Sequence, residues 1–438
     1  MKQTRANFSQ DALVSTIRTC LSSSLTRHNI SNNGQISTLD CLMSGFGMFT
    51  FKFPTMLSFD EAYKENSTLR RNMYNLFGCS DVPCDTTMRE RLDVISPDVI
   101  RKCFTAIFAR LQRARLLDHF KFLDKSHIIS IDGTGYFSSP SIHCENCCVK
   151  EHRSGQKTYY HQMLSAALVH PDQKVVYPFV PEPILKQDGA DKNDCERNAM
   201  KRWLKEFRRE HPHLEVVIVA DGLSSNHPFI KLLEEYNVNY ILVCQEADHK
   251  YLVDWFNAAD DQDAPLFTLV RDKVHGKYRY MHNVPLNGSC NTKVNVLRYE
   301  ETKDGKDKTS KWMWVTNLKI EKDNAYEIMK GGRARWRIEN ETFNTLKNEG
   351  YNFEHNYGHG YKYLSTTLAY LMLLAFFVDQ VLLAVNKRLN AALEKLHWKK
   401  YLWNWVRNIF QTCICPSFES LYDAIVHRPN PIELSKIA

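Results

Sequence analysis

Two aspartates, Asp132 and Asp221, each follow an apolar, β-branched run and stand directly before a glycine. The runs cover residues 128–131 and 216–220, and continuous runs of this kind are typical of strands buried on both faces. Each aspartate is therefore expected at the mouth of the sheet, where a strand ends. Two such carboxylates repel each other unless a cation neutralises them, and hard oxygen ligands suit Mg²⁺ or Mn²⁺. Either pair alone is equally well explained as an Asp-Gly turn.

A third carboxylate with basic neighbours occurs in residues 331–347. At 100° per residue, Arg335, Glu339 and Lys347 lie close to one stripe of a helix, which gives a carboxylate flanked by cations. A solvated Arg–Glu pair one turn apart is the ordinary explanation for such a pattern. The two strand-end aspartates favour the functional interpretation here.

Other carboxylates compete for the same role. Glu341 lies about 200° around the helix from Glu339, so the two cannot share a face. A second group precedes a predicted helix, where capping is the favoured role. This group consists of Asp188, Asp191, Asp194 and Glu196.

The ordered residues Asp132, Asp221 and Glu339 resemble the catalytic triad of the bacterial insertion-sequence DDE transposases. The closest group is the cut-and-paste kind with a β-rich insertion before the glutamate, whose signature is Tyr-x2-Arg-x3-Glu-x6-Lys. Arg335 and Glu339 match it, whereas Gly332 and Leu346 occupy the tyrosine and lysine positions and Lys347 comes one residue late. Upstream, residues 311–317 resemble the strand that precedes the signature helix.

The resemblance implies a two-metal site for Mg²⁺ or Mn²⁺, in which Asp132 bridges both ions and Asp221 and Glu339 each complete one site. It also implies transposon-end and target DNA as partners, with a homodimer in the DNA complex. Trp312 stands where the family stacks a flipped base, and a buried strand tryptophan is the alternative. The expected DNA contacts are Arg335, Arg337, Lys347, Lys192 and Trp312.

The periodicity predicts an α/β protein with five segments. Residues 1–120 read as helical, either a DNA-binding module or a brace against the core. Residues 121–245 give three strands, a helix, a strand, a helix and a strand, the order of a ribonuclease-H-like catalytic core. Five strands are expected. The first ends at Asp132, the second and third cover residues 163–169 and 174–180, the fourth ends at Asp221, and the fifth covers residues 239–244. Residues 246–325 form a β-rich insertion, 326–362 the catalytic helix completing the core, and 363–438 a C-terminal helical region.

Composition limits the cellular setting only loosely. The 438 residues carry a formal net charge of +7, which suits a polyanionic partner but is modest. The apolar stretch 364–385 contains Asp379 and Gln380, so we expect a buried core helix and no membrane. No signal peptide is recognisable, and thirteen cysteines suggest reduced thiols, which predicts a cytoplasmic, nucleoid-associated protein.

A cysteine–histidine cluster spans residues 143–161. His143, Cys144, Cys147, Cys148 and His152, with His161 further on, are of the right types for zinc. No second C-x2-C or H-x3-H pair accompanies Cys144 and Cys147. The sequence therefore favours reduced thiols in a loop, with zinc as the alternative.

Together these patterns predict a DNA transposase that cuts and joins the ends of its own element. The alternatives are a domesticated DNA-binding protein and a metal-dependent nuclease without strand transfer. Three converging carboxylates disfavour a pure binding protein, which gains nothing from their repulsion.

Overall fold

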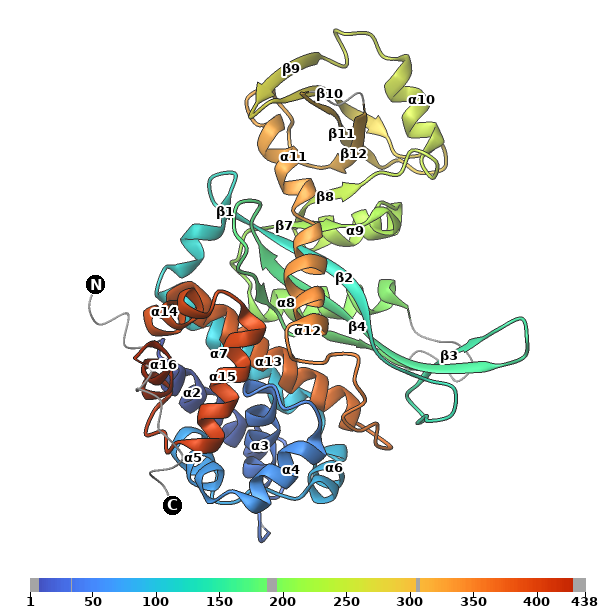
Figure 1. Ribbon diagram of the computed structural model, residues 1–438. Coiled ribbons are helices and arrows are strands. Elements are labelled where there is room, and N and C mark those ends of the chain that lie inside the picture. The colour runs from blue at the N-terminus through green and yellow to red at the C-terminus, as the bar shows by residue number, and fades with distance from the viewer. Residues whose placement is uncertain (1–7, 33, 187–194, 305–307, 428–438) are drawn as a thin grey trace.

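The computed structural model describes residues 8–32, 34–186, 195–304 and 308–427. It contains a twelve-stranded mixed sheet with helices packed around it, which confirms the predicted α/β class (Figure 1). The strands follow the order β3-β4-β2-β7-β8-β12-β11-β10-β9, and three short strands pair off this path.

The centre of the sheet carries the two apolar runs. Strands β2 (Ser126–Ser139) and β7 (Val216–Ala220) are parallel, and β8 (Asn239–Val243) continues the parallel set. On the other side of β2, β4 (Lys157–Val169) runs antiparallel. Every residue of β7 is buried, as its continuous apolar character predicts.

The first strand does not end at Asp132, and that prediction is wrong. β2 continues to Ser139 because β4 pairs with it from Ile128 to Ser139. Only the pairing with β7 stops early, with Ser130 opposite Val219 as its last pair. Asp132 therefore lies within a strand that has lost one neighbour.

The predicted strand at residues 174–180 is also largely absent. The structure has only the two-residue β5 (Tyr177–Pro178), followed by β6 (Glu182–Ile184), and both pair with β4. Short β1 (Lys121–Phe122) pairs with β2, and β3 (Cys148–Glu151) pairs with β4. Helices α8 (Glu196–Glu210) and α9 (His227–Glu235) follow the predicted order.

Between β8 and the signature helix lies a mainly β segment. It comprises α10 (Lys250–Ala258), β9 (Leu266–Arg271), β10 (Val274–Pro285), β11 (Lys293–Lys303) and β12 (Thr309–Thr316). It forms the lobe at the top of Figure 1. Because β12 pairs antiparallel with β8, the lobe extends the central sheet.

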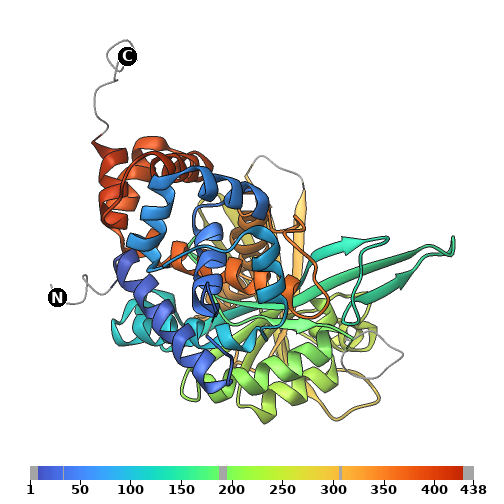
Figure 2. The same ribbon diagram turned by 90° about the horizontal axis from the view of Figure 1, so that it is seen from below.

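Helices from the two ends of the chain pack together beside the sheet, the first set blue and the second red in Figure 2. The long helix α13 contacts α2, α3, α6 and α7. Local signals set the helix ends: a Thr55–Ser58 capping box starts α4, and Gly78, with φ of 68°, ends α5. The helices are α2 (Gln10–Arg27), α3 (Thr38–Thr50), α4 (Met56–Glu65), α5 (Ser67–Phe77), α6 (Asp85–Asp93), α7 (Asp98–Arg113), α13 (Leu364–Val385), α14 (Lys387–Leu396), α15 (Lys399–Thr412) and α16 (Phe418–Val426).

Helix α13 is the expected buried helix. It is long and apolar enough to cross a membrane by length and composition, and 83% of its most apolar window is buried inside the protein. Its two polar residues have internal partners: the Asp379 carboxylate meets Lys52 and Tyr351, and Gln380 Oε1 accepts the Val176 N–H at 3.1 Å. A buried core helix with satisfied polar groups accounts for this stretch.

Candidate active site

Asp132 and Asp221 lie on neighbouring parallel strands at the same level of the sheet. Each stands two residues beyond the last β2–β7 pair, Ser130 with Val219. Neighbouring strands are about 4.8 Å apart, so the two carboxylates emerge side by side. Asp221 also caps a short 3₁₀ turn, because its Oδ1 accepts the Leu223 N–H at 3.2 Å.

The signature helix crosses β2 as three consecutive pieces (Figure 1). They are α11 (Ala325–Arg333), the π-helical turn η3 (Ile338–Phe343), and α12 (Asn344–Asn348). Between the first two, the buried Ser130 hydroxyl donates to the Arg335 carbonyl oxygen at 2.8 Å. This bond fixes the helix to the strand that carries Asp132, two residues away on the same face.

Arg335 joins two of the three predicted carboxylates. Its Nη1 lies 2.6 Å from Glu339 Oε1 and 4.0 Å from Asp132 Oδ2. Burial, reinforced by the negative charge of Glu339, raises the pKa of Asp132 to about 7, although Arg335 opposes the shift. Asp221 contributes to the same increase, so the three carboxylates form one electrostatic group.

The rival glutamate faces elsewhere. Glu341 Oε1 lies 3.0 Å from Arg337 Nη1, and Arg337 also donates to the Pro171 carbonyl at 2.6 Å. Both Glu339 and Glu341 stand in the π turn, and the negative charge of Glu339 is the one that helps to raise the pKa of Asp132. π turns recur at functional sites, where they redirect side chains.

The π turn also accounts for the late lysine. In a regular helix Leu346, seven residues after Glu339, returns to nearly the same direction. A π turn holds more residues than a regular helical turn, so Lys347 is expected near that place instead of Leu346. Leu346 is fully buried, whereas Lys347 is exposed and its Nζ lies 2.7 Å from Glu354 Oε1.

The missing tyrosine has a packing reason. A Cβ on Gly332 would lie 2.5 Å from Nε1 of Trp314, an indole that is 1% exposed. No side chain fits at this position while β12 places Trp314 against the helix. The tyrosine of the signature therefore has no counterpart at residue 332.

The remaining predicted DNA contacts are dispersed. Trp312 is half-buried, with the Tyr299 ring centroid at 5.7 Å and the Arg333 guanidinium 4.7 Å above it. Arg337 is held by Glu341 and Pro171, away from the carboxylate group. Lys192, Asp188, Asp191 and Asp194 lie outside the described residues.

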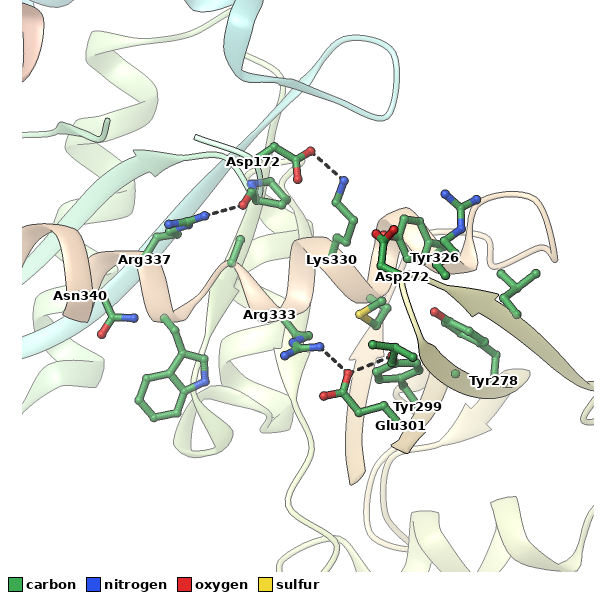
Figure 3. A pocket seen from close by; sticks show the side chains of 18 residues that line it. Asp172, Asp272, Tyr278, Tyr299, Glu301, Tyr326, Lys330, Arg333, Arg337 and Asn340 are labelled. Atoms are coloured by element: carbon green, nitrogen blue, oxygen red, sulfur yellow. Dashed lines mark hydrogen bonds and ion pairs between the residues drawn. The ribbon is translucent and has the colours of Figure 1, made fainter. Parts of the chain in front are cut away.

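A cavity of about 590 Å³ flanks the signature helix on the side of Arg337 (Figure 3). Two of its basic residues are in ion pairs: Lys330 Nζ lies 2.7 Å from Asp172 Oδ2, and Arg333 Nη1 lies 2.8 Å from Glu301 Oε2. Asp132, Asp221 and Glu339 do not line it. The cavity is thus a neighbour of the carboxylate site and does not contain it.

Sequence reasoning missed the position of Glu196. Within the described part of the chain no side-chain hydrogen bond caps α8, and a Cβ on Gly133 would collide with the Glu196 carboxylate. Glycine therefore lets Glu196 approach β2 from the face opposite Asp132. Partial burial and the charge of Asp221 raise the pKa of Glu196. The sequence signal for this close approach was Gly133 itself, but a glycine after an aspartate also suits a turn.

The site suits a divalent cation by its chemistry. Asp132, Asp221 and Glu339 offer only carboxylate oxygens, and burial together with the neighbouring negative charges raises the pKa of Asp132 to about 7. Hard oxygen donors of this kind bind Mg²⁺ or Mn²⁺. These three residues would hold the metal.

We expect Asp132→Asn to stabilise the metal-free protein above pH 7. The pKa of Asp132 is raised from about 3.9 unfolded to about 7 folded, so the folded state binds more protons between these values and loses stability as pH rises through them. Removing the charge should raise the free energy of unfolding by up to roughly 4 kcal/mol at pH 8 and by little at pH 4. Urea unfolding in chelator at both pH values measures this. Asp254→Asn, at an exposed aspartate of α10, is the control, and equal effects of the two variants would contradict the argument.

The comparisons with known proteins agree with this geometry. The family model described as "Transposase DDE domain" matches residues 127–377, more than half of the chain. No curated protein matches the chain. The matched span begins in β2, ends in α13 and includes Asp132, Asp221 and Glu339. The chain belongs to the DDE transposase family.

Proposed function

We propose that this chain cuts DNA at the ends of its own insertion element and joins those ends to target DNA. The observation that carries the proposal is the meeting of Asp132, Asp221 and Glu339, from three separate elements, beside Arg335. A bound pair of divalent ions would stabilise the attacking and leaving oxygens of an in-line phosphoryl displacement. The residues are proposed as the catalytic triad.

Strand order supports a ribonuclease-H-like core. Short β5 and β6 lie beside β4, followed by β2, β7 and β8, with only β4 antiparallel to β2 among the long central strands. Strands β9 to β12 fall between Asp221 and Glu339, which favours the bacterial cut-and-paste group with a β-rich insertion. We also propose a homodimer in the DNA complex, because two element ends need two active sites.

Arg335 has two roles in this proposal. In the free protein its guanidinium partly neutralises Glu339 and Asp132. When cations take over that neutralisation, the guanidinium becomes available for a DNA phosphate, which arginine binds through a planar fork of donors. Trp336, 51% exposed with Arg335 4.3 Å from its ring, offers an adjacent stacking surface.

A strand-transfer assay tests the proposal against its alternatives. Purified protein is incubated with Mg²⁺, labelled DNA carrying the element's ends, and a plasmid target. Labelled ends joined to the plasmid are expected. Cleavage without joining would indicate a nuclease, and binding without cleavage would indicate a DNA-binding protein.

Lys347→Met should weaken DNA binding and reduce its dependence on salt. Each phosphate contact releases counterions, so losing one should lower the slope of log K against log salt by about one. Fluorescence anisotropy across a salt series measures this. Lys231→Met on α9 is the matched control, since Lys231 is also an exposed lysine paired with a glutamate, at 2.7 Å. An unchanged slope for Lys347→Met would remove Lys347 from the DNA interface.

Deleting the N-terminal helices would not test whether they bind DNA. They pack against the buried helix α13, so deleting them would expose its apolar surface. Their contribution to recognising element ends stays a proposal, to be tested by substituting exposed basic residues such as Arg71.

A further inference from the structure

Four potential zinc ligands converge in a place remote from the carboxylates. Cys144 and Cys147 lie in the loop between β2 and β3, His161 lies in β4, and His359 lies in the loop between α12 and α13. Their Sγ and imidazole nitrogen atoms all lie within 4.8 Å of one another. His161 was among the candidates in the sequence, whereas His359 was not, and the expectation of a loop with ordinary thiols is revised here.

Four separations that involve the two sulfur atoms are close to those of a tetrahedral zinc site. Cys144 Sγ lies 3.8 Å from Cys147 Sγ and 3.5 Å from His161 Nε2. Cys147 Sγ lies 3.4 Å from Nε2 of both His161 and His359. A tetrahedral zinc with Zn–S near 2.3 Å and Zn–N near 2.05 Å requires roughly 3.8 Å between sulfurs and roughly 3.6 Å between sulfur and nitrogen.

We propose that Cys144, Cys147, His161 and His359 bind a structural zinc ion. Both imidazoles aim Nε2 at the cluster, and both are almost fully buried, at 2% and 7% exposure. Their Nδ1 atoms have no hydrogen-bond partner within the described residues. Two buried imidazoles fixed only through Nε2 at a shared centre are better explained by a metal than by weak thiol hydrogen bonds.

The thiols support the same assignment. Cysteine binds metal as its thiolate, and Cys144 Sγ and Cys147 Sγ lie together with the two imidazoles. The Cys144 backbone N–H also points to Cys147 Sγ at 3.4 Å. Thiolate and imidazole together select zinc over Mg²⁺, so this ion differs from the catalytic ones.

The site is closed, which indicates a structural role. Four protein ligands leave no position for water or substrate. The Phe137 ring stacks on His359 with centroids 4.1 Å apart, and Tyr136 and Phe137 both lie 5.8 Å from His161. This aromatic wall keeps solvent from the ligands.

The zinc would join parts of the chain that must stay in register for catalysis. β2 carries Asp132 and leads to Cys144, while Glu339 stands in the helix that leads to His359. Near the cluster, Asn146 Nδ2 also donates to the Lys362 carbonyl at 3.2 Å. A zinc ion at this junction would fix the segment after the signature helix to the β2–β4 pair.

Metal analysis of the full-length protein, purified without chelators, tests the proposal. We expect about one tightly held zinc per chain, lost in His359→Ala and retained in His359→Cys, because Cys₃His sites also bind zinc. Cys413→Ser, at an exposed cysteine elsewhere, should retain the metal. Mass spectrometry of the metal content and circular dichroism give the readout.

Cobalt substitution provides a second readout that does not depend on a variant's folding. Co²⁺ added to metal-depleted wild-type protein should give the d–d and thiolate charge-transfer bands of a tetrahedral S₂N₂ site, and zinc should abolish them. Substoichiometric zinc in folded wild-type protein, or bands typical of octahedral oxygen ligation, would overturn the proposal.

Discussion

Glu339→Gln should lower DNA cleavage by about three orders of magnitude or more, while DNA binding changes little. A neutral amide keeps the shape of the side chain but ligates divalent metal poorly, which removes several kcal/mol of transition-state stabilisation. The same result is expected for Asp132→Asn and Asp221→Asn. Cleavage is measured with labelled element ends and Mg²⁺, and binding by gel shift in Ca²⁺.

Glu341→Gln is the matched control for this prediction. It makes the same chemical change two residues away in the same π turn, where Glu341 pairs with Arg337 at 3.0 Å. Its cleavage rate should stay within about fivefold of wild type, since a partly exposed ion pair contributes about 1 kcal/mol or less. Full activity in Glu339→Gln together with loss of activity in Glu341→Gln would disprove the assignment, because Glu341 would then be the catalytic glutamate.

Lys52→Met should destabilise the fold by about 3–5 kcal/mol, because it leaves the Asp379 carboxylate buried without its cation. Both side chains are almost wholly buried, at 1% and 3% exposure. The Lys52 ammonium also lies 4.4 Å from the Tyr351 ring centroid and 4.1 Å from that of Trp403. This cluster joins the end of α3 to α13, to α15 and to the segment after the signature helix.

Chemical denaturation of three variants measures the effect. Lys125→Met, which breaks an exposed pair with Glu215 at 2.9 Å, should cost less than about 1 kcal/mol. The double variant Lys52→Met/Asp379→Asn should recover most of the loss, since no uncompensated charge remains. A small effect of Lys52→Met alone would mean that water reaches the pair.

The sequence by itself determined the features that depend on local pattern. The run of residues 216–220 predicted a strand ending at Asp221, and the structure has that strand. The spacing of Arg335 and Glu339 predicted that both lie on one face of a helix, and the structure places Arg335 Nη1 2.6 Å from Glu339 Oε1. The apolar stretch with two isolated polar residues predicted the buried helix α13.

Only the tertiary structure decided the contacts between distant segments. Whether β2 continued past Asp132 depended on its partner β4, and whether Gly332 could carry a side chain depended on Trp314 of β12. The π turn that brings Lys347 into place alters hydrogen bonding within a helix whose sequence shows no break.

The clearest case is the cluster of Cys144, Cys147, His161 and His359. A C-x2-C pair fixes two ligands by local geometry and His161 follows in the next long strand, but His359 comes from a loop 212 positions after Cys147. Their convergence follows from the packing of the signature helix across β2 and β4. Sequence spacing carries no trace of such a contact, because only the folded chain brings distant residues within bonding distance.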